Sequence, residues 1–209
     1  MTITIDPNTT AGVAVDAQKG FMPGQGPGFN ELAAPQGDEI AEPAAAVAKL
    51  TRIYAASADL HTPDHASFVE QGGIWPVHCV KGTPGAALHP LVAKVVTPGW
   101  LFGKGITRDT DAYSAFDGIN DDGRKLEEML REEGIDTIVV VGLVTNVCVI
   151  ATVLDALKAG LRVIVVLEGV RGIPGGDGLP TPEQAVEQMR DAGAIIVEKV
   201  AGLRATVEA

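Results

Sequence analysis

The chain has 209 residues, 46% of them hydrophobic, which is enough to bury a full core and close to the upper size for one domain. Its 16 basic and 27 acidic side chains give a formal net charge of -11, which repels nucleic-acid phosphates and anionic membrane surfaces. We therefore expect one domain over residues 1–209 and a small-molecule partner, with no nucleic acid and no membrane.

Cysteine content and the start of the chain indicate the compartment. The two cysteines, Cys79 and Cys148, imply no disulfide framework, and the first residues lack the basic and apolar regions of a secretory signal. The uncharged stretch 137–154 is interrupted by Gly142 and two polar residues, so it predicts strand, turn and buried helix rather than a membrane span. We expect a cytoplasmic protein whose oligomeric state stays open, a homo-oligomer included.

Short β-branched runs alternate with helical patterns along the chain. The runs predict strands at 13–15, 53–57, 92–97, 137–141, 162–166 and 194–197. The patterns predict helices at 43–49, 122–133, 147–159 and 182–192, and the last three are followed by Gly134, Gly160 and Gly193 as C-caps. Because the strands are apolar enough to need cover on both faces, we expect a three-layer, doubly wound α/β fold with a mainly parallel six-stranded sheet.

Two long segments, 20–42 and 57–90, show no clear periodicity. Loops of that length are usually functional or disordered. The second contains all four histidines and Cys79, which favours function. In a doubly wound sheet, such loops and the active site lie beyond the carboxyl ends of the strands.

Cys148 follows the strand 137–141 and lies at the start of the helix that runs to Ala159. If Thr145 or Asn146 caps this helix, nearby amides and the positive end of the helix dipole lower the thiol pKa from its usual ~8.5. The same amides could hold an oxyanion. The alternative role is a buried cysteine that only packs.

Two further strand ends could supply partners for this thiol. Asp16 ends the first strand, and Lys104 follows the segment 101–103 after the third. Alone, Asp16 would more often cap a turn and Lys104 would be solvated. Together with Cys148 they fit an amide hydrolase, in which Asp16 takes the thiol proton and gives it to departing ammonia, while Lys104 holds Asp16.

The histidine-rich segment 57–90 predicts a metal site. Asp59 and His61 can point the same way from an extended strand end, the turn at 62–63 can return His65 to them, and His78 could complete the set. One carboxylate with imidazoles suits zinc, iron or manganese, and spacing does not choose among them. A lone loop histidine is usually structural, but this clustering favours a metal.

Five other residues near these motifs could have a functional or a structural role. Cys79 is an alternative nucleophile or soft ligand, but it has no helix start behind it, so we favour Cys148. For His89 we expect a structural role. Three of the nine aromatic residues fall beside the motifs, and core packing is their simplest role: Phe21, Trp75 and Tyr113.

From about Val13 to Val197 the chain resembles the isochorismatase-like cysteine hydrolases, and within them the nicotinamidase (pyrazinamidase) family. The Asp, Lys and Cys elements are shared with superfamily members that act on other amides and on a vinyl ether, whereas the histidines and the Trp-Pro-x-His-Cys run are typical of nicotinamidases. Five ordered elements carry the resemblance: Asp16 with Gln18 and Phe21; Asp59, His61 and His65; residues 75–85; Lys104–Gly105 with Tyr113–Phe116; and residues 142–148.

The resemblance implies hydrolysis of nicotinamide to nicotinate and ammonia through a thioester on Cys148, in NAD salvage, with tolerance of pyrazinamide. It implies that the metal binds the pyridine nitrogen directly or through water and that Phe21 and Trp75 flank the ring. Tyr113 and Val144 are further substrate contacts by the same resemblance. It also implies a cis peptide before Val144, whose amide joins that of Cys148 in the oxyanion hole.

Three positions depart from the family pattern. Nicotinamidases usually carry Thr-Asp where this chain has Thr145-Asn146, and Asn146 could still cap the helix while removing a negative charge. Val147 changes the pocket wall, which leaves the preferred amide open. Leu60 stands where an aromatic is common, and we expect little effect from it.

Three alternatives stay open on these residues. One is hydrolysis of another small amide. This alternative would be favoured if the purified protein lacked bound metal or did not hydrolyse pyridine carboxamides. Another is a catalytically silent, metal-binding or assembly subunit, against which the intact Asp16, Lys104 and Cys148 argue. The third is a metal-water hydrolase that uses Cys148 only for packing.

Overall fold

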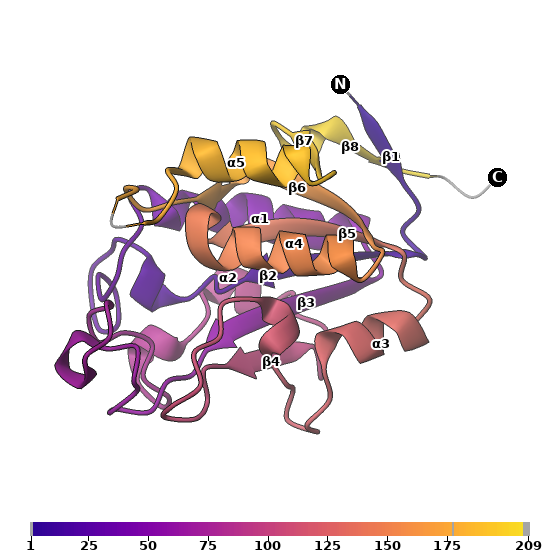
Figure 1. The fold of residues 1–209 in the computed structure, drawn as a ribbon. Helices are drawn as coiled ribbons and strands as arrows, with labels where there is room; N and C mark the ends of the chain where they lie inside the picture. The colour runs from indigo at the N-terminus through magenta and orange to yellow at the C-terminus, as the bar shows by residue number, and fades with distance from the viewer. Residues whose placement is uncertain (1, 177, 207–209) are drawn as a thin grey trace.

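The computed structural model describes residues 2–176 and 178–206, and a parallel sheet forms its centre (Figure 1). The strands lie in the order β4-β3-β2-β5-β6-β7, and every neighbouring pair is parallel. The predicted α/β fold with a six-stranded sheet is confirmed. The strands are β2 (Thr10–Val15), β3 (Ile53–Asp59), β4 (Leu101–Lys104), β5 (Thr137–Leu143), β6 (Arg162–Arg171) and β7 (Ile195–Val197).

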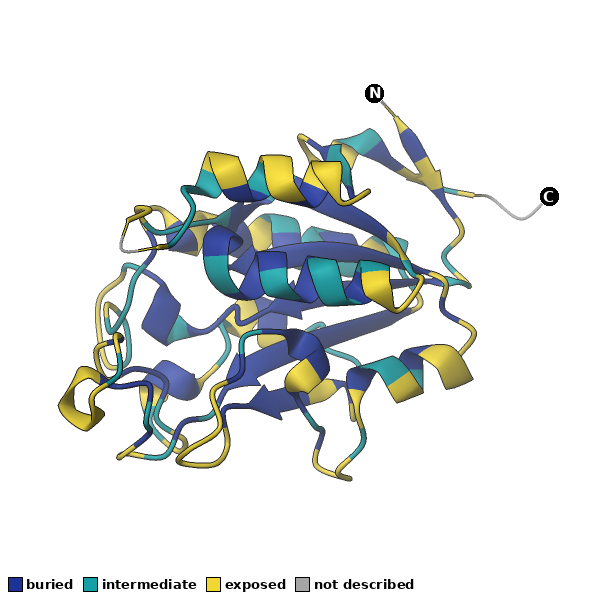
Figure 2. Ribbon diagram, in the orientation of Figure 1, coloured by how far each residue is buried: buried dark blue, intermediate teal, exposed yellow. Residues whose placement is uncertain are grey.

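Helices cover both faces of this sheet. Alternate strand residues bury toward opposite faces, so that Val13 and Ile138 join one core cluster while Ala14 and Val139 join the other. The inner strands β2, β3 and β5 are accordingly wholly buried, whereas β6 and β7 are partly so (Figure 2). One face carries α3 (Leu126–Glu132), α4 (Ile150–Lys158) and α5 (Pro182–Asp191), and the other carries α1 (Ala41–Val47) and α2 (Pro90–Ala93).

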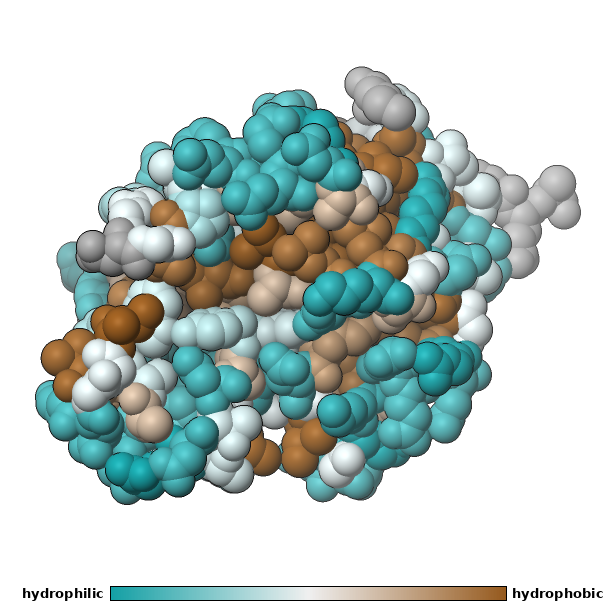
Figure 3. Space-filling view, viewed as in Figure 1, coloured by the Kyte–Doolittle hydropathy of each residue, from teal (hydrophilic) through white to brown (hydrophobic). Residues whose placement is uncertain are grey.

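The surface over α4 is a strip of mostly apolar side chains between the hydrophilic surfaces of α5 and α3 (Figure 3). Leu154 and Leu157 are only partly buried against the core there. None of the described helices is long and apolar enough to cross a membrane, and the uncharged stretch 137–154 forms strand, turn and helix, as predicted.

A small second sheet and several short turns complete the described chain. β1 (Ile3–Ile5) pairs in parallel with β8 (Leu203–Ala205), bringing the two ends of the described chain together. The sequence did not predict this pair, whose two three-residue segments lie about 200 residues apart in the chain. The turns are η1 (Lys19–Phe21), η2 (Gly37–Ile40), η3 (Ala48–Leu50), η4 (Val69–Gln71), η5 (Pro84–Ala86), η6 (Ala115–Asp117), η8 (Val200–Gly202) and the π-helical η7 (Thr145–Val149).

The predicted strand at 92–97 is wrong, because this segment forms the end of α2 and a turn. Pro90 occupies the first turn of α2, and the His89 side chain accepts the N–H of Leu91, so local capping favours a helix. The strand that pairs with β3 is β4 instead, with Lys104 opposite Asp59. Lys104 is therefore the last residue of a strand rather than part of a loop after it.

The strand order places the site. The chain passes outward from β2 through β3 to β4, then returns to β5 on the other side of β2 and continues to β6 and β7. The strand order thus reverses between β2 and β5, and in such sheets ligands bind beyond the carboxyl ends at this point. The predicted Asp16, Asp59, Lys104 and Cys148 all lie at or just after these ends.

Candidate active site

Cys148 lies in the turn that joins β5 to α4. The peptide bond from Leu143 to Val144 is cis, as the resemblance implied, and η7 follows it directly. The N–H groups of Val147 and Val149 both donate to the carbonyl of Val144, at 3.1 and 3.2 Å. Single π-helical turns of this kind often occur at functional sites. The turn leaves Cys148 buried against the core yet lining a pocket at the sheet edge.

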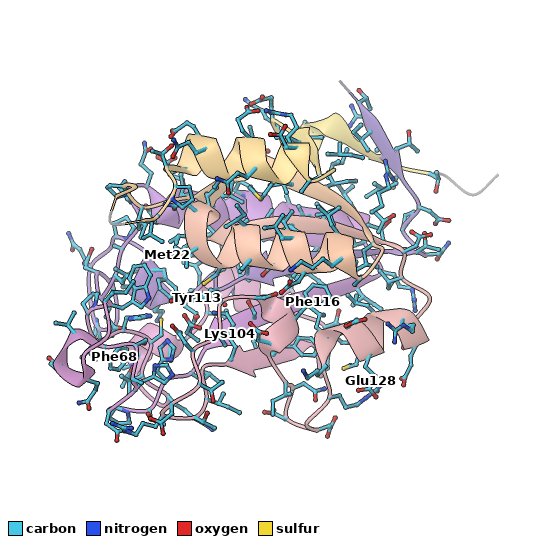
Figure 4. The ribbon with its side chains drawn as sticks, in the orientation of Figure 1. Met22, Phe68, Lys104, Tyr113, Phe116 and Glu128 are labelled. Carbon is cyan, nitrogen blue, oxygen red and sulfur yellow. The ribbon has the colours of Figure 1, made fainter. Side chains whose placement is uncertain are left out.

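Lys104 is the centre of the polar cluster at this edge (Figure 4). Its Nζ lies 2.9 Å from Asp16 Oδ2 and 3.5 Å from Cys148 Sγ. It also donates to Asp59 Oδ1 and, at 3.1 Å, to the carbonyl of Ala112. Because the ammonium is fully buried, these partners replace the water that it loses. The three predicted catalytic residues are thus brought together from β2, β4 and η7.

Asp16 is held by a residue that the sequence did not single out. Ser57 Oγ donates to Asp16 Oδ1 at 2.7 Å and accepts the Asp16 N–H at 3.3 Å. These bonds fix Asp16 in a left-handed conformation, φ 44°, which a non-glycine residue adopts only when its surroundings determine it. The signal in the sequence was the single serine in the apolar strand β3, two residues before Asp59.

Gln18 belongs to the motif of Asp16, Gln18 and Phe21, and its contacts explain why a glutamine lies two residues after Asp16. Its Nε2 donates to the carbonyls of Asp59 and Ala86 at 2.8 and 2.9 Å, and its Oε1 accepts the Asp59 N–H at 2.8 Å. Gln18 therefore fixes the backbone of Asp59 from both sides. The Asp59 side chain, which faces both Lys104 and the histidines, is thereby held in position.

Burial controls the protonation of the cluster. Burial raises the pKa of the Cys148 thiol well above its ordinary value, and the opposing effect of Lys104 does not cancel it. The prediction that the helix start lowers this pKa is therefore wrong for the resting protein, in which the thiol is neutral. Burial also raises the pKa of Asp16 while Lys104 lowers it, with burial prevailing, which brings the carboxylate closer to the range of an effective general base.

Asp59, His61 and His78 form a group with converging ligand atoms. Asp59 Oδ2 lies 3.6 Å from Nε2 of His61 and 3.9 Å from Nε2 of His78. Nδ1 of His61 and of His78 lies 3.2 and 2.7 Å from the carbonyls of Gly105 and Pro76. A carbonyl only accepts, so each Nδ1 carries a proton, and the Nε2 of a neutral ring in this position has a lone pair free for a metal.

The protonation states of this group suit a divalent metal. Burial raises the pKa of the Asp59 carboxyl, but the Lys104 ammonium and His61 together outweigh this effect and hold that pKa below its usual range, so the carboxylate is ionised. Burial lowers the pKa of His78, which keeps its ring neutral. An ionised carboxylate and two imidazoles, each fixed by a backbone carbonyl, are a fitting ligand set.

His65 has other partners than the predicted metal. Its Nδ1 accepts the Ser67 N–H at 3.3 Å and lies 2.8 Å from Ser67 Oγ, so its Nε2 carries the proton and donates to the Thr110 carbonyl at 3.2 Å. Its ring lies 4.2 Å from that of His61, centroid to centroid. With both nitrogens engaged, His65 packs beside the group of ligand atoms rather than in it.

The pocket beside these residues is largely apolar. Its cavity volume is only about 20 Å³, so its walls lie close together. The Trp75 Nε1–H donates to the Tyr113 hydroxyl at 3.3 Å, and the Phe21 ring lies 5.4 Å from that of His78. All four predicted substrate contacts line the pocket: Phe21, Trp75, Tyr113 and Val144. Leu32 and Ile173 also line it, and no local pattern marked them.

Cys79 and His89 lie outside this pocket. Cys79 is buried, its Sγ–H points to the Gly85 carbonyl at 3.6 Å, and burial raises its pKa well above the ordinary value. His89 caps α2. The structure thus gives neither residue contact with the thiol cluster.

The sequence of residues 10–199 matches the isochorismatase domain family. The chain belongs to the isochorismatase family. It is 36% identical to the nicotinamidase of Escherichia coli, over 76% of this chain and 81% of that protein.

Solved structures of this family share the fold. The pyrazinamidase of Pyrococcus horikoshii in complex with zinc is 36% identical, with a TM-score of 0.75, over 91% of this chain and 99% of that chain. PnC1 from L. infantum in complex with nicotinate is 28% identical, with a TM-score of 0.84, over 99% of this chain and 100% of that chain.

Asn146, a departure from the nicotinamidase pattern, does not cap a helix. Neither η7 nor α4 has a side-chain cap, so the predicted capping by Thr145 or Asn146 is wrong. The buried Asn146 amide donates to the carbonyls of Ile173 and Pro180 at 3.0 and 2.8 Å, and its oxygen accepts the Ile173 N–H at 3.1 Å. Asn146 therefore ties the loop after β6, which carries Ile173 to the pocket, to the active-site turn.

Replacing Asn146 with aspartate should destabilise this isochorismatase fold. A carboxylate cannot donate, so two carbonyls would face a buried negative charge, at a cost of about 2–4 kcal/mol and a fall in Tm of roughly 5–15 °C. Calorimetry of the variant measures this. The matched control is Asn30→Asp, since Asn30 makes an equivalent pair of bonds to Gly24 but is exposed. Equal changes in Tm for the two variants would contradict the role of Asn146.

Proposed function

We propose that this member of the isochorismatase family is a nicotinamidase, a single cysteine-hydrolase domain that converts nicotinamide to nicotinate and ammonia and accepts pyrazinamide. The observation that carries the proposal is one pocket lined by the Cys148 thiol and by the Asp59, His61 and His78 group, with the Lys104 ammonium 3.5 Å from the thiol sulfur and paired with Asp16. The similar nicotinamidase and pyrazinamidase sequences and structures support it. Its place would be NAD salvage in the cytoplasm, where both free thiols stay reduced.

The proposed chemistry begins with the proton of Cys148. Asp16 takes this proton, and the thiolate attacks the carboxamide carbon, with the Val144 and Cys148 amides as donors to the oxyanion. The protonated Asp16 returns the proton to the departing nitrogen, which leaves as ammonia, and the acyl group stays on sulfur as a thioester. Water then attacks the thioester, and Asp16 relays its proton to the sulfur. Nicotinate leaves, and the thiol is restored.

Lys104 stays protonated throughout, because two carboxylates raise its pKa well above the ordinary value despite its burial. It fixes Asp16 and stabilises the negative charge on sulfur as that charge develops. Asp59, His61 and His78 would hold a divalent metal such as zinc, iron or manganese, with His65 packed beside them. When bound, the metal would supply a Lewis acid for the lone pair of the pyridine nitrogen. Phe21 and Trp75 would flank the ring.

Ammonia release from nicotinamide, compared with benzamide, tests the proposal. Benzamide lacks the ring nitrogen, so we expect kcat/KM for nicotinamide to exceed that for benzamide by at least about 10²-fold. Chelation should remove most of this preference, and added zinc should restore it. No release by metal-replete protein would rule out nicotinamide and favour another small amide. Equal turnover of both amides, insensitive to chelation, would contradict the metal's role in binding the ring.

A further inference from the structure

Glu31 occupies a slot whose walls are glycines. Its Oε2 accepts the backbone N–H of Cys79 at 2.8 Å. A Cβ placed on Gly85 would lie only 2.0 Å from that oxygen, and one on Gly20 would lie 2.8 Å from it. The carboxylate therefore fits because residue 85 has no side chain. The ion pairs among the described residues do not include Glu31, so its partner is this backbone N–H rather than a cation.

The peptide that Glu31 holds connects two of the converging histidines. Cys79 directly follows His78, and its carbonyl accepts the N–H of His61 at 3.2 Å. Its φ is 46°, a left-handed conformation that a non-glycine residue keeps only under external restraint. The N–H bond to Glu31 is such a restraint. Without it, a strained residue with an unpaired N–H would lie between His61 and His78.

Glu31 also joins this loop to the opposite wall of the pocket. The next residue, Leu32, lines the pocket, and its N–H donates to the Gly20 carbonyl at 2.9 Å. Gly20 in turn precedes Phe21, another lining residue. The Glu31 side chain thus connects the segment 20–32, by its hydrogen bond to Cys79, to the loop that carries His78.

We propose that Glu31 is a positioning residue for the metal site: by holding the Cys79 peptide, it keeps the imidazoles of His61 and His78 directed at the Asp59 carboxylate. The proposal rests on the metal site of the proposed function and not on its amide substrate. It requires only an accepted hydrogen bond at Oε2, so glutamine should serve nearly as well as glutamate, while alanine should not.

The test is the zinc affinity of metal-free protein, measured by competition with a chromophoric chelator and without any amide. We expect Glu31→Ala to weaken zinc binding by at least about 10-fold and Glu31→Gln by less than about 3-fold. Gly85→Ala leaves Glu31 in the chain but fills its slot, and it should weaken binding as Glu31→Ala does. The control is Glu133→Ala, which removes a carboxylate paired with Arg52 at the other end of the sheet and should bind zinc normally.

Wild-type zinc affinity in Glu31→Ala or in Gly85→Ala would overturn the proposal. Equal weakening in Glu31→Ala and Glu31→Gln would also overturn it, since charge or packing would then be what matters. Circular dichroism reports folding, and loss of the fold in both alanine variants would make Glu31 a requirement of the fold instead. Wild-type protein that binds no zinc would overturn this proposal and the proposed metal site together. Zinc binding with no nicotinamide turnover would leave this proposal standing and overturn only the substrate.

Discussion

Replacing Cys148 with serine should lower ammonia release from nicotinamide by on the order of 10⁴-fold or more in kcat. The serine hydroxyl fits the same buried position, 3.5 Å from the Lys104 ammonium in the native protein, but its proton is far less acidic than that of a thiol. A carboxylate such as that of Asp16 is too weak a base to remove it effectively, even with its pKa raised by burial. Steady-state kinetics with saturating nicotinamide and zinc measures the loss.

Cys79→Ser is the matched control, because it makes the same change in the other buried cysteine. Its side chain does not line the pocket, and the hydroxyl can still donate to the Gly85 carbonyl, so most of the activity should remain. Full activity in Cys148→Ser together with loss on chelation would instead favour a metal-water hydrolase in which Cys148 only packs.

Lys104→Met should abolish activity and destabilise the protein by about 3–5 kcal/mol, the usual cost of removing one member of a buried ion pair. Methionine fills a similar volume but leaves the Asp16 and Asp59 carboxylates buried without a cation. Burial and Asp59 then raise the pKa of Asp16 against the Ser57 hydrogen bond alone, so Asp16 is protonated and cannot act as a base. We expect kcat to fall by at least about 10³-fold.

The pH dependence of this variant has a definite sign. A carboxyl group whose pKa is higher in the folded than in the unfolded state contributes stability at low pH, which is lost as the pH rises through the folded pKa. Lys104→Met should therefore lose more stability at about pH 8 than at about pH 5, as measured by denaturant titration.

Lys158→Met is the control for this substitution. It breaks a Lys–Asp pair of 3.0 Å on the surface of α4 and should change stability by less than about 1 kcal/mol at either pH. A loss of stability in Lys104→Met that is no larger than in this control would show that Lys104 does not hold the two carboxylates.

The sequence prediction of the fold failed at one strand of the main sheet, because local capping favours a helix there. The run 92–97 has the composition of a strand, but Pro90 and the His89 cap start a helix just before it. β4 is short and contains Gly103, so its own pattern is weak, and its pairing with β3 marks it only in the folded sheet. The three-residue pair β1 and β8 joins segments about 200 residues apart, which no local window detects.

The sequence by itself determined five of the six strands of the sheet, four of the helices that cover it and the edge that carries Asp16, Asp59, Lys104 and Cys148. It could do so because side-chain periodicity and strand ends are local properties of the chain, and because parallel strands bring their carboxyl ends to one edge.

The tertiary structure alone decided which groups those residues meet. Ser57 beside Asp16, Glu31 beside Cys79 and the paired nitrogens of His65 all depend on contacts between residues that no pattern links. It also reversed the expected shift of the Cys148 pKa, since burial outweighs the effect of the neighbouring charge. Hydrogen-bond partners and desolvation are properties of the packed interior, and the linear chain does not contain them before it folds.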